Sequence, residues 1–424
     1  MSLRGAEKRV KRHQCQRSAP CAKGNCGRTG KKSLQMGGVS RKSRKRPTLV
    51  VGMKSNGKFQ MKISHQILAI TASLLSSQTI SHAQFSGFNS GDLVVLQDGT
   101  GSAGLTSAGT ALYLDQYTTS GSFVNDLAIP STAGDSGNEL VNSGTAASEG
   151  QLSLSANDQY LVFAGYNVAA GTTGVSSSTS SADPRGIVTV DATGNYTLTA
   201  TTTTFYSANN IRGGTSDGKG NIWGAGPGGT VYLGSGTAAQ ISSVNSLAVQ
   251  DIGGNLFYST AKGTTGIYKI SGTPASGTAT PTLLIGNANP SDFTFNANMT
   301  IAYVANTGSG ANGGISRYNF NGTSWTLAYT LDSNTAMNGV VANFSGTDPI
   351  IYATTESGTS LVEITDAGVG TTSGATVLDT AGSNEAFRGL EFAPESVPEP
   401  ATCALVGLGL MTLLSINRHH NRKS

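Results

Sequence analysis

The residues that could do chemistry in the central part of the chain form a short list, because residues 84–396 contain neither histidine nor cysteine. Without these two side chains there can be no Ser-His-Asp triad, no Cys-His dyad and no zinc site made of the usual ligands. Carboxylates, Tyr, Lys and Arg are left, which keeps glycosidase-like or lyase-like chemistry open. The sequence predicts no particular catalytic residue.

Three arginines and one tryptophan are candidates for ligand binding. Arg185, Arg212 and Arg388 lie in or near strands, or loops, that we expect at the centre of the fold, where they could meet carboxylates of a sugar. The alternative is that they pair with acidic residues such as Glu391 for structural reasons. Trp223 could stack on a sugar ring, although aromatic residues in strands more often pack between sheets.

Two loops carry oxygen-bearing side chains that could hold a metal. The turn from Asp217 to Asn221 reads Asp-Gly-Lys-Gly-Asn, which spaces its oxygen donors in a way that could bind Ca²⁺. Asp-Gly turns are also ordinary hairpin chemistry, so a structural turn is the alternative. A second acidic loop, with Asp135, Asn138 and Glu139, has the same two interpretations. We expect no other cofactor.

The elements that must position these side chains are strands. Short runs of alternating or β-branched residues are divided by Gly, Asn, Asp, Ser and Thr turns roughly every eight to twelve residues, with no helical period, so we predict an all-β protein. One unit is expected to have strands near 152–154 and at 160–164, 186–191 and 196–201, and four strands in series make a propeller blade. Similar units begin, about 35 to 60 residues apart, near Gln151, Ile211, Ser246, Asp292 and Gly339.

The two ends of this region complement each other. Residues 387–392 match the first strand of each unit but have no following strands, whereas 91–99, 111–119 and 122–130 look like the other three strands of a blade. Pairing them would hide two exposed sheet edges. The sequence therefore predicts a β-propeller of about six four-stranded blades over 84–396, with seven blades or a right-handed parallel β-helix as alternatives. The segments resemble secreted bacterial β-propeller proteins in which "LSLSPDGKYL"-like hairpins recur, and these repeats specify no activity.

An export signal is predicted just before the propeller. From Met61 the chain has a short basic start, an apolar stretch over 67–75 and a small-residue ending, Ser-His-Ala, so 61–83 is expected to be a signal peptide cut between Ala83 and Gln84. A buried core helix is the alternative. Residues 1–60 hold 17 of the 28 Lys and Arg against one acidic residue, Glu7, which is typical of a disordered basic leader. A translation start assigned too far upstream would explain it; a genuine long leader or a nucleic-acid-binding arm are the other possibilities.

A second targeting signal is predicted at the C-terminus, in residues 397–424. A Pro-Glu-Pro turn precedes sixteen mostly apolar residues, 401–416, which as a helix would span roughly 24 Å, less than the roughly 30 Å hydrocarbon core of a bilayer. A basic cluster follows, on the side where cytoplasmic segments concentrate positive charge. The residues that define the signal are Val397, Pro398, Glu399, Pro400, Arg418, Arg422 and Lys423.

This tail resembles the bacterial PEP-CTERM sorting signal, which is recognised by an exosortase, a membrane-embedded transpeptidase-like enzyme. The resemblance implies the exosortase and the export machinery as partners, and transient anchoring in the inner membrane by a short C-terminal transmembrane helix. It also implies a final location at the cell envelope, on the outer surface or outside the cell. A plain tail anchor is the alternative.

Charge and the distribution of acidic residues narrow the function of the exported part. Residues 84–396 have seven Lys and Arg against 22 Asp and Glu, a formal net charge of −15, which argues against nucleic acid as a partner. Two function classes remain: a non-catalytic surface or matrix propeller that binds exopolysaccharide or another surface protein, and an extracellular hydrolase or lyase with carboxylates at the propeller axis. Because Asp and Glu are scattered through turns, we favour the first.

Overall fold

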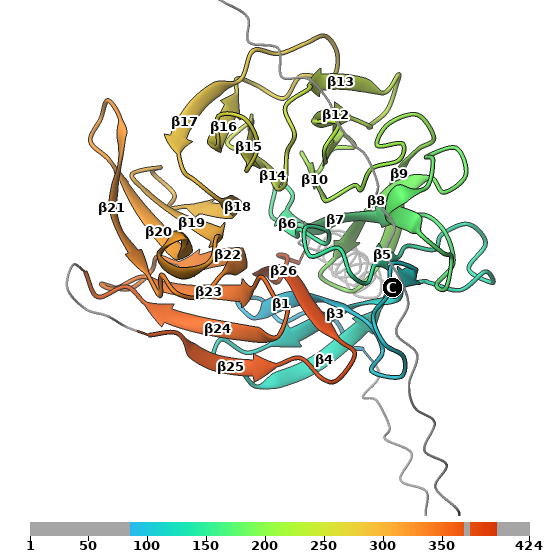
Figure 1. Ribbon diagram of the computed structural model, residues 1–424, viewed down its shortest axis with the longest axis horizontal. Coiled ribbons are helices and arrows are strands. Elements are labelled where there is room, and N and C mark those ends of the chain that lie inside the picture. The colour runs from blue at the N-terminus through green and yellow to red at the C-terminus, as the bar shows by residue number, and fades with distance from the viewer. Residues whose placement is uncertain (1–84, 369–373, 397–424) are drawn as a thin grey trace, which may run out of the picture. The chain divides into compact units, whose positions relative to one another are not determined.

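A ring of six antiparallel sheets makes up the protein in the computed structural model, which describes residues 85–368 and 374–396 (Figure 1). The all-β prediction is confirmed, since the described part of the chain contains, besides strands, two 3₁₀ turns at Val175–Ser177 and Gly310–Asn312. No helix in these residues is long and apolar enough to cross a membrane. The predicted signal peptide with its cleavage site, Ala83 and Gln84, and the C-terminal sorting signal with its transmembrane helix lie outside the described residues.

Each sheet is a blade of four strands, ordered here from the axis outward. Blade 1 contains β26 (Ala386–Phe392), β1 (Leu93–Asp98), β3 (Leu112–Tyr117) and β4 (Phe123–Ala128); blade 2 contains β6 (Ser153–Leu154), β7 (Tyr160–Tyr166), β8 (Arg185–Asp191) and β9 (Tyr196–Thr202). Blade 3 contains β10 (Gly213–Ser216), β11 (Ile222–Ala225), β12 (Thr230–Tyr232) and β13 (Ala239–Ser242); blade 4 contains β14 (Val249–Ile252), β15 (Asn255–Thr260), β16 (Gly266–Ile270) and β17 (Thr282–Gly286). Blade 5 contains β18 (Pro290–Phe295), β19 (Ile301–Thr307), β20 (Gly313–Phe320) and β21 (Trp325–Leu331); blade 6 contains β22 (Met337–Asn343), β23 (Ile350–Thr355), β24 (Ser360–Thr365) and β25 (Thr376–Thr380). A short pair, β2 (Gly109–Thr110) and β5 (Asn142–Ser143), lies outside the blades.

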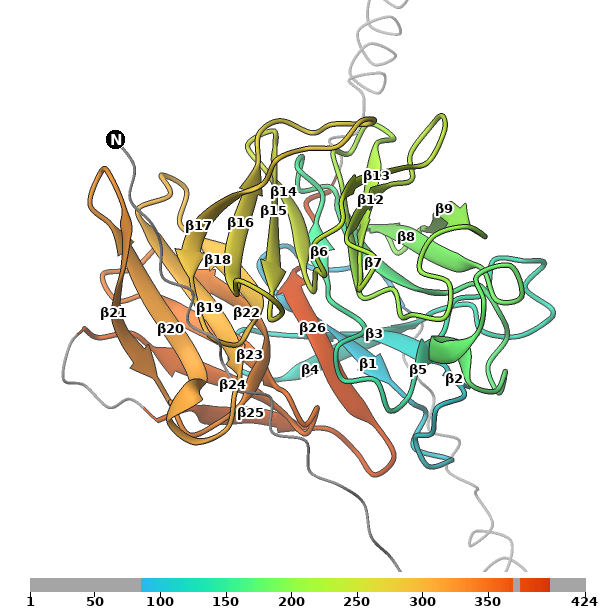
Figure 2. The ribbon, with the colours of Figure 1, turned by 45° about the horizontal axis from the view of Figure 1, so that its top comes forward.

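The ring closes through blade 1, as predicted. Strand β26, the last of the chain, pairs antiparallel with β1, the first, so that Leu93 lies opposite Phe392 and Asp98 opposite Ala386. Figure 2 shows β26 in red beside β1 in blue. The prediction of six blades is confirmed, and the seven-blade alternative is wrong. The parallel β-helix alternative is also wrong, because the strands within every blade pair antiparallel.

Six apolar layers, one between each pair of neighbouring blades, hold the ring together. Successive side chains of a strand point to opposite faces, so a strand in the middle of a blade contributes to two layers. In β7, Leu161 and Phe163 pack between blades 1 and 2, whereas Val162 and Ala164 pack between blades 2 and 3. This arrangement explains the nearly continuous apolar runs of the middle strands, and it lets the ring form without disulfides.

Candidate functional site

The Arg388 side chain forms an ion pair inside the protein and is not available to bind a ligand. Its Nε donates to Asp98 Oδ2 at 2.7 Å and its Nη2 to the carbonyl oxygen of Gly144 at 3.0 Å, and its side chain is 4% exposed. The prediction that Arg388 meets a ligand is therefore wrong, because its guanidinium is buried and paired. The structural alternative is correct, with Asp98 and not Glu391 as the acidic partner.

Arg185 begins β8, the third strand of blade 2, and not a strand next to the axis. It is fully buried, its guanidinium donates to the carbonyl oxygens of Ser178 and Asn209 at 2.8 Å each, and it lies 4.9 Å from the centre of the Tyr166 ring. Neither the predicted position nor the ligand role holds for Arg185, since its side chain is buried and its two terminal nitrogens donate to groups inside the protein.

Arg212, just before β10, is the one arginine of the three near the axis and partly exposed. Its Nη1 donates to Asn245 Oδ1 at 2.7 Å and to the carbonyl oxygen of Ser246 at 3.0 Å. Burial lowers the pKa of its guanidinium, and the nearby Glu149 opposes this. Arg212 thus ties blade 3 to the segment that leads into blade 4. The buried Glu149 carboxyl interacts electrostatically with Arg212, Arg185 and Arg388, so the three arginines share one internal acidic neighbour.

Polar side chains and close backbone contacts fill the axis. Gln151 Nε2 donates to Ser291 Oγ at 3.2 Å and to Asn338 Oδ1 at 3.0 Å, and Ser291 Oγ donates to Asn338 Oδ1 at 2.8 Å. These residues come from blades 2, 5 and 6 and are all buried. At Gly389 of β26 an added Cβ would lie 2.4 Å from the amide nitrogen of Leu152, so only glycine allows this approach. Two carboxyl groups also lie on the innermost strands, Asp292 on β18 and Glu391 on β26, and burial raises the pKa of Asp292 to about 7 and that of Glu391 to about 8. Backbone amides donate hydrogen bonds to both.

Trp223 and the Asp217 turn are structural. The Trp223 ring is fully buried between blades 3 and 4, and its Nε1 donates to the carbonyl oxygen of Pro274 at 2.8 Å, so the prediction that it stacks on a sugar is wrong. The Asp217 carboxylate accepts hydrogen bonds from the amides of Lys219 and Asn221 at 2.7 and 3.0 Å and from Asn221 Nδ2 at 2.6 Å. These bonds fix a hairpin turn, which is the alternative interpretation of this segment.

The second acidic loop is also closed on itself. Asp135 Oδ2 accepts hydrogen bonds from the amide and hydroxyl of Thr132 at 2.7 and 3.0 Å, and these bonds lower the pKa of its carboxyl group. The carbonyl oxygen of Asn138 accepts from the Tyr196 hydroxyl, and Glu139 is largely buried. Within 85–368 and 374–396, no group of three or more His, Cys, Asp or Glu is placed to hold a metal ion.

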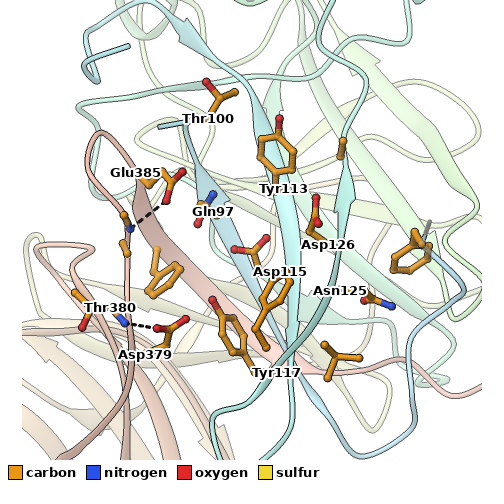
Figure 3. A pocket seen from close by; sticks show the side chains of 17 residues that line it. Gln97, Thr100, Tyr113, Asp115, Tyr117, Asn125, Asp126, Asp379, Thr380 and Glu385 are labelled. Carbon is orange, nitrogen blue, oxygen red and sulfur yellow. Dashed lines mark hydrogen bonds between the residues drawn. The ribbon is translucent and has the colours of Figure 1, made fainter. Parts of the chain in front are cut away.

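A cleft of about 840 Å³ lies between blade 6 and blade 1, away from the axis. It is bounded by β3 and β4 on one side and by the end of β25 and the loop to β26 on the other (Figure 3). Its carboxylates are Asp115, Asp126, Asp379 and Glu385. Its aromatic and amide side chains are Phe85, Tyr113, Tyr117, Phe123, Phe387, Gln97 and Asn125. No Lys, Arg or His of the described segments lines it, so the cleft is strongly acidic.

The alternation of β3 builds one wall of the cleft. Tyr113, Asp115 and Tyr117 share the face turned to blade 6, while Leu112 and Leu114 on the opposite face pack between blades 1 and 2. In the neighbouring strand β4, Asp126 is directly opposite Asp115. Like charges directly opposite each other destabilise a strand pair, so this sequence is not explained by the folding of the blade alone.

Asp115 is the central group of the cleft. It is only 5% exposed, and no side chain or amide described by the structure donates a hydrogen bond to its carboxylate. Figure 3 shows it in the middle of the labelled polar side chains. Burial, and then the negative charges of Asp126, Glu385 and Asp379, raise its pKa to about 8. At neutral pH Asp115 is therefore mostly protonated, a carboxyl group without a partner.

Aromatic rings form the deeper wall and one lip. The Tyr117 ring meets Phe123 and Phe387 edge to face, with centroids 5.6 and 6.2 Å apart. Phe123 is 54% exposed, among the most exposed large apolar side chains in the described residues. Burial, and then the carboxylate of Asp115, raise the pKa of Tyr117, so its hydroxyl stays protonated. The cleft thus offers hydrogen-bonding groups beside flat apolar faces.

The sequence patterns described above do not predict this cleft. The available signal was the alternation Tyr-x-Asp-x-Tyr over 113–117, which places a carboxyl group between two tyrosines on one face of a strand. A second, smaller hollow of about 340 Å³ lies between blades 5 and 6. There Arg317 Nη1 is 2.6 Å from Asp366 Oδ2, and the Tyr329 hydroxyl donates to Asp366 Oδ1 at 2.6 Å, so Arg317 and Asp366 already have partners.

Comparison with known proteins adds no family. No protein-family model and no curated protein sequence matches the chain. Among solved structures, the chain is similar to a putative 6-phosphogluconolactonase from Bacteroides fragilis, with 12% identity over 68% of this chain and 82% of that one and a TM-score of 0.41. It is also similar to the periplasmic gluconolactonase of Pseudomonas aeruginosa (12% identity, 68% and 83% covered, TM-score 0.40). TolB from Acinetobacter baumannii is a third such structure (10% identity, 72% and 68% covered, TM-score 0.38).

Proposed function

We infer that the protein is an exported β-propeller that binds a carbohydrate at the cell envelope or in the extracellular matrix, without catalysis, and that the cleft between blades 6 and 1 is its binding site. The observation that carries this proposal is the unpartnered Asp115 in an acidic cleft with aromatic walls. A buried polar group without a hydrogen bond destabilises the folded state, so its retention calls for a ligand. Clefts of about 300–1,000 Å³ are typical of small-molecule sites.

The proposal that the protein is exported depends on two targeting signals predicted from the sequence. A signal peptide over 61–83 would be removed before Gln84, and the PEP-CTERM-like tail from Val397 would bring the chain to an exosortase. Edman sequencing of native material is expected to begin at Gln84, and fractionation is expected to find the protein in the envelope or the medium. A native N-terminus at Met1 together with a cytosolic location would refute the export part.

The binding role is favoured over catalysis by what the centre of the propeller holds. At the axis Gln151, Ser291 and Asn338 form a neutral hydrogen-bond network. The carboxyl groups of Asp292 and Glu391, on the innermost strands, accept hydrogen bonds from backbone amides of the protein. Residues 84–396 also lack the His and Cys that most hydrolytic sites use. Both observations support a binding site at the side of the ring.

A carbohydrate-active hydrolase or lyase is the second candidate, in the same cleft. A carboxyl group that stays protonated at neutral pH beside ionised ones is the pattern of a general acid with its partner. Asp115, with its pKa raised to about 8, fits the role of the general acid. Asp126 lies directly opposite it in the neighbouring strand. This candidate needs Asp115 for bond cleavage, whereas the binding role needs it only for affinity.

One experiment separates the two candidates. The purified protein is incubated with the exopolysaccharide of the bacterium that makes it, and both co-sedimentation and the release of reducing ends or unsaturated products are measured. Binding without product supports the binding module, whereas product formation that Asp115→Asn abolishes supports the enzyme. Neither binding nor product would overturn the assignment of the cleft to carbohydrate.

A further inference from the structure

We propose that the cleft between blades 6 and 1 takes an amino sugar, whose protonated amine lies against the carboxylate of Asp115. This inference rests on the proposed binding function and names the chemical class of its ligand. It follows from the charge of the cleft, from the burial of Asp115 and from the aromatic walls.

The charge of the cleft calls for a cation. The carboxylates of Asp379 and Glu385 come from the end of β25 and the loop to β26, and they face Asp115 and Asp126 across the cleft (Figure 3). No Lys or Arg of the described residues lines the cleft to offset them. Carboxylates held near one another in a partly desolvated site repel. A neutral ligand would leave that repulsion in place, whereas a ligand with an ammonium group removes it.

Two other carboxylates of the cleft accept hydrogen bonds from backbone amides, whereas Asp115 accepts none from the described residues. Glu385 Oε2 accepts a hydrogen bond from the amide of Gly382 at 3.0 Å, and Asp379 Oδ1 accepts one from the amide of Thr380 at 2.8 Å. The Asp115 carboxyl, at 5% exposure, receives none within the described part of the chain. An ammonium carries several N–H donors, so a single one can reach Asp115 and a neighbouring carboxylate together.

Proton release should accompany binding. The groups that face Asp115 from the surrounding elements are the carboxylates of Asp126, Asp379 and Glu385 and the hydroxyls of Tyr113 and Tyr117. Burial and the three carboxylates disfavour the charged form of Asp115 in the empty cleft, whereas the two hydroxyls carry no charge. A cation at hydrogen-bond distance favours that form, so the carboxyl group loses its proton to the buffer when the ligand binds.

The rest of the cleft suits a sugar carrier. Phe123, which is 54% exposed, presents an aromatic ring on which the apolar side of a pyranose can pack and toward which a cation is attracted, and the buried Tyr117 ring supports it from behind. Gln97, Asn125 and Thr100 offer amide and hydroxyl groups for sugar hydroxyls. A volume of about 840 Å³ is far larger than a lone ammonium requires, so the amine is expected on a carrier of sugar size.

Isothermal titration calorimetry with matched oligosaccharides tests the proposal on the purified protein. The probes are a glucosamine oligomer and the N-acetylglucosamine oligomer of equal length, which is neutral. We expect the glucosamine oligomer to bind at least roughly tenfold more tightly, as a charge-assisted hydrogen bond implies. At pH 7 its binding heat should differ between two buffers of different ionisation enthalpy, because a proton is released.

Two variants and one control assign the effect to the cleft. Asp115→Asn keeps the shape of the side chain but should lose the tenfold preference and the proton release, and Asp379→Asn should reduce the preference without abolishing the release. Glu395→Gln removes a charge from an exposed position outside the cleft and should change neither. If Asp115→Asn does not fold, Asp379→Asn still decides the question.

The outcomes separate this inference from the proposed function. Equal affinity for both oligomers, or binding of the exopolysaccharide but of neither oligomer, would overturn the amino-sugar assignment and leave the binding function standing. A preference for the glucosamine oligomer that survives in Asp115→Asn would overturn the role of Asp115. No binding to the polysaccharide or to either oligomer would overturn both proposals.

Discussion

Asp115→Asn should become more stable relative to the wild-type protein as the pH rises from about 4 to 8. In the folded protein the Asp115 carboxyl has its pKa raised from 3.8 to about 8, chiefly by burial. Between these values the folded state keeps a proton that the unfolded chain has lost, so the wild-type protein loses stability as pH rises from about 4 to 8. Asparagine does not titrate, so the variant is free of this loss. The difference between the two proteins should therefore grow with pH.

The size of the effect follows from the same shift. From 3.8 to about 8 is a difference of roughly four pKa units, or about 6 kcal/mol at ~1.4 kcal/mol per unit. Because water can enter the cleft and relax around a new charge, about half of that is expected, ~3 kcal/mol at pH 8 relative to pH 4. The cost of burying the amide itself is the same at both pH values and cancels from this comparison.

Equilibrium urea unfolding at pH 4 and pH 8 measures the difference. The fully buried Trp223 supplies a fluorescence signal for unfolding. Glu395→Gln, at an exposed position, serves as the control and should stay within about 0.5 kcal/mol of the wild type at both pH values. An Asp115→Asn effect of equal size at both pH values, or a loss of stability on going to pH 8, would show that the carboxyl group is not held protonated by its surroundings.

Three further substitutions test residues that the sequence analysis had considered for binding. Arg388→Met should destabilise the fold by ~3–5 kcal/mol in urea unfolding, because it leaves Asp98 as a buried charge without its partner; a change below about 1 kcal/mol would contradict the ion pair. Trp223→Phe should cost ~1–3 kcal/mol through the lost hydrogen bond to Pro274 and lost volume, with oligosaccharide titrations unchanged. Asp217→Ala should lower stability by about 1–2 kcal/mol, equally with Ca²⁺ or a chelator, and a Ca²⁺-dependent loss would revive the metal interpretation.

The sequence predicted the ring because each blade carries its own local evidence. Turns such as Asp217 to Asn221 separate strands of alternating pattern, and the strands predicted at 186–191 and 196–201 agree with β8 and β9 to within one residue at each end. The closing strand was recognised because 387–392 repeats the pattern of a first strand without successors. The outermost strands β13 and β17 were not predicted, since one face of each is open to solvent and their sequences lack a continuous apolar run.

The site could not be predicted in the same way. Arg185, Arg212 and Arg388 share a predicted place near an inner strand or a loop leading to the axis. In the structure Arg185 begins β8, the third strand of its blade, and its side chain is buried, which the pattern of residue types does not decide. Asp115 and Asp379 are more than 260 positions apart in the chain and meet only because β26 closes the ring. Whether a carboxylate in such a place is paired depends on packing, which the pattern of residue types does not contain.

The position of the cleft also connects ligand binding with the integrity of the ring. The other five junctions join blades that follow each other in the chain, whereas blades 6 and 1 meet where strands from the two ends of the propeller are brought together. A ligand between Asp115 of β3 and Asp379 of β25 would touch both sides of this junction, so its binding free energy adds to closure of the ring. Repulsion among the carboxylates weakens the same junction when it is empty. Acidic residues that destabilise the fold without its ligand are therefore expected in a binding site, because such sites lose stability in exchange for function.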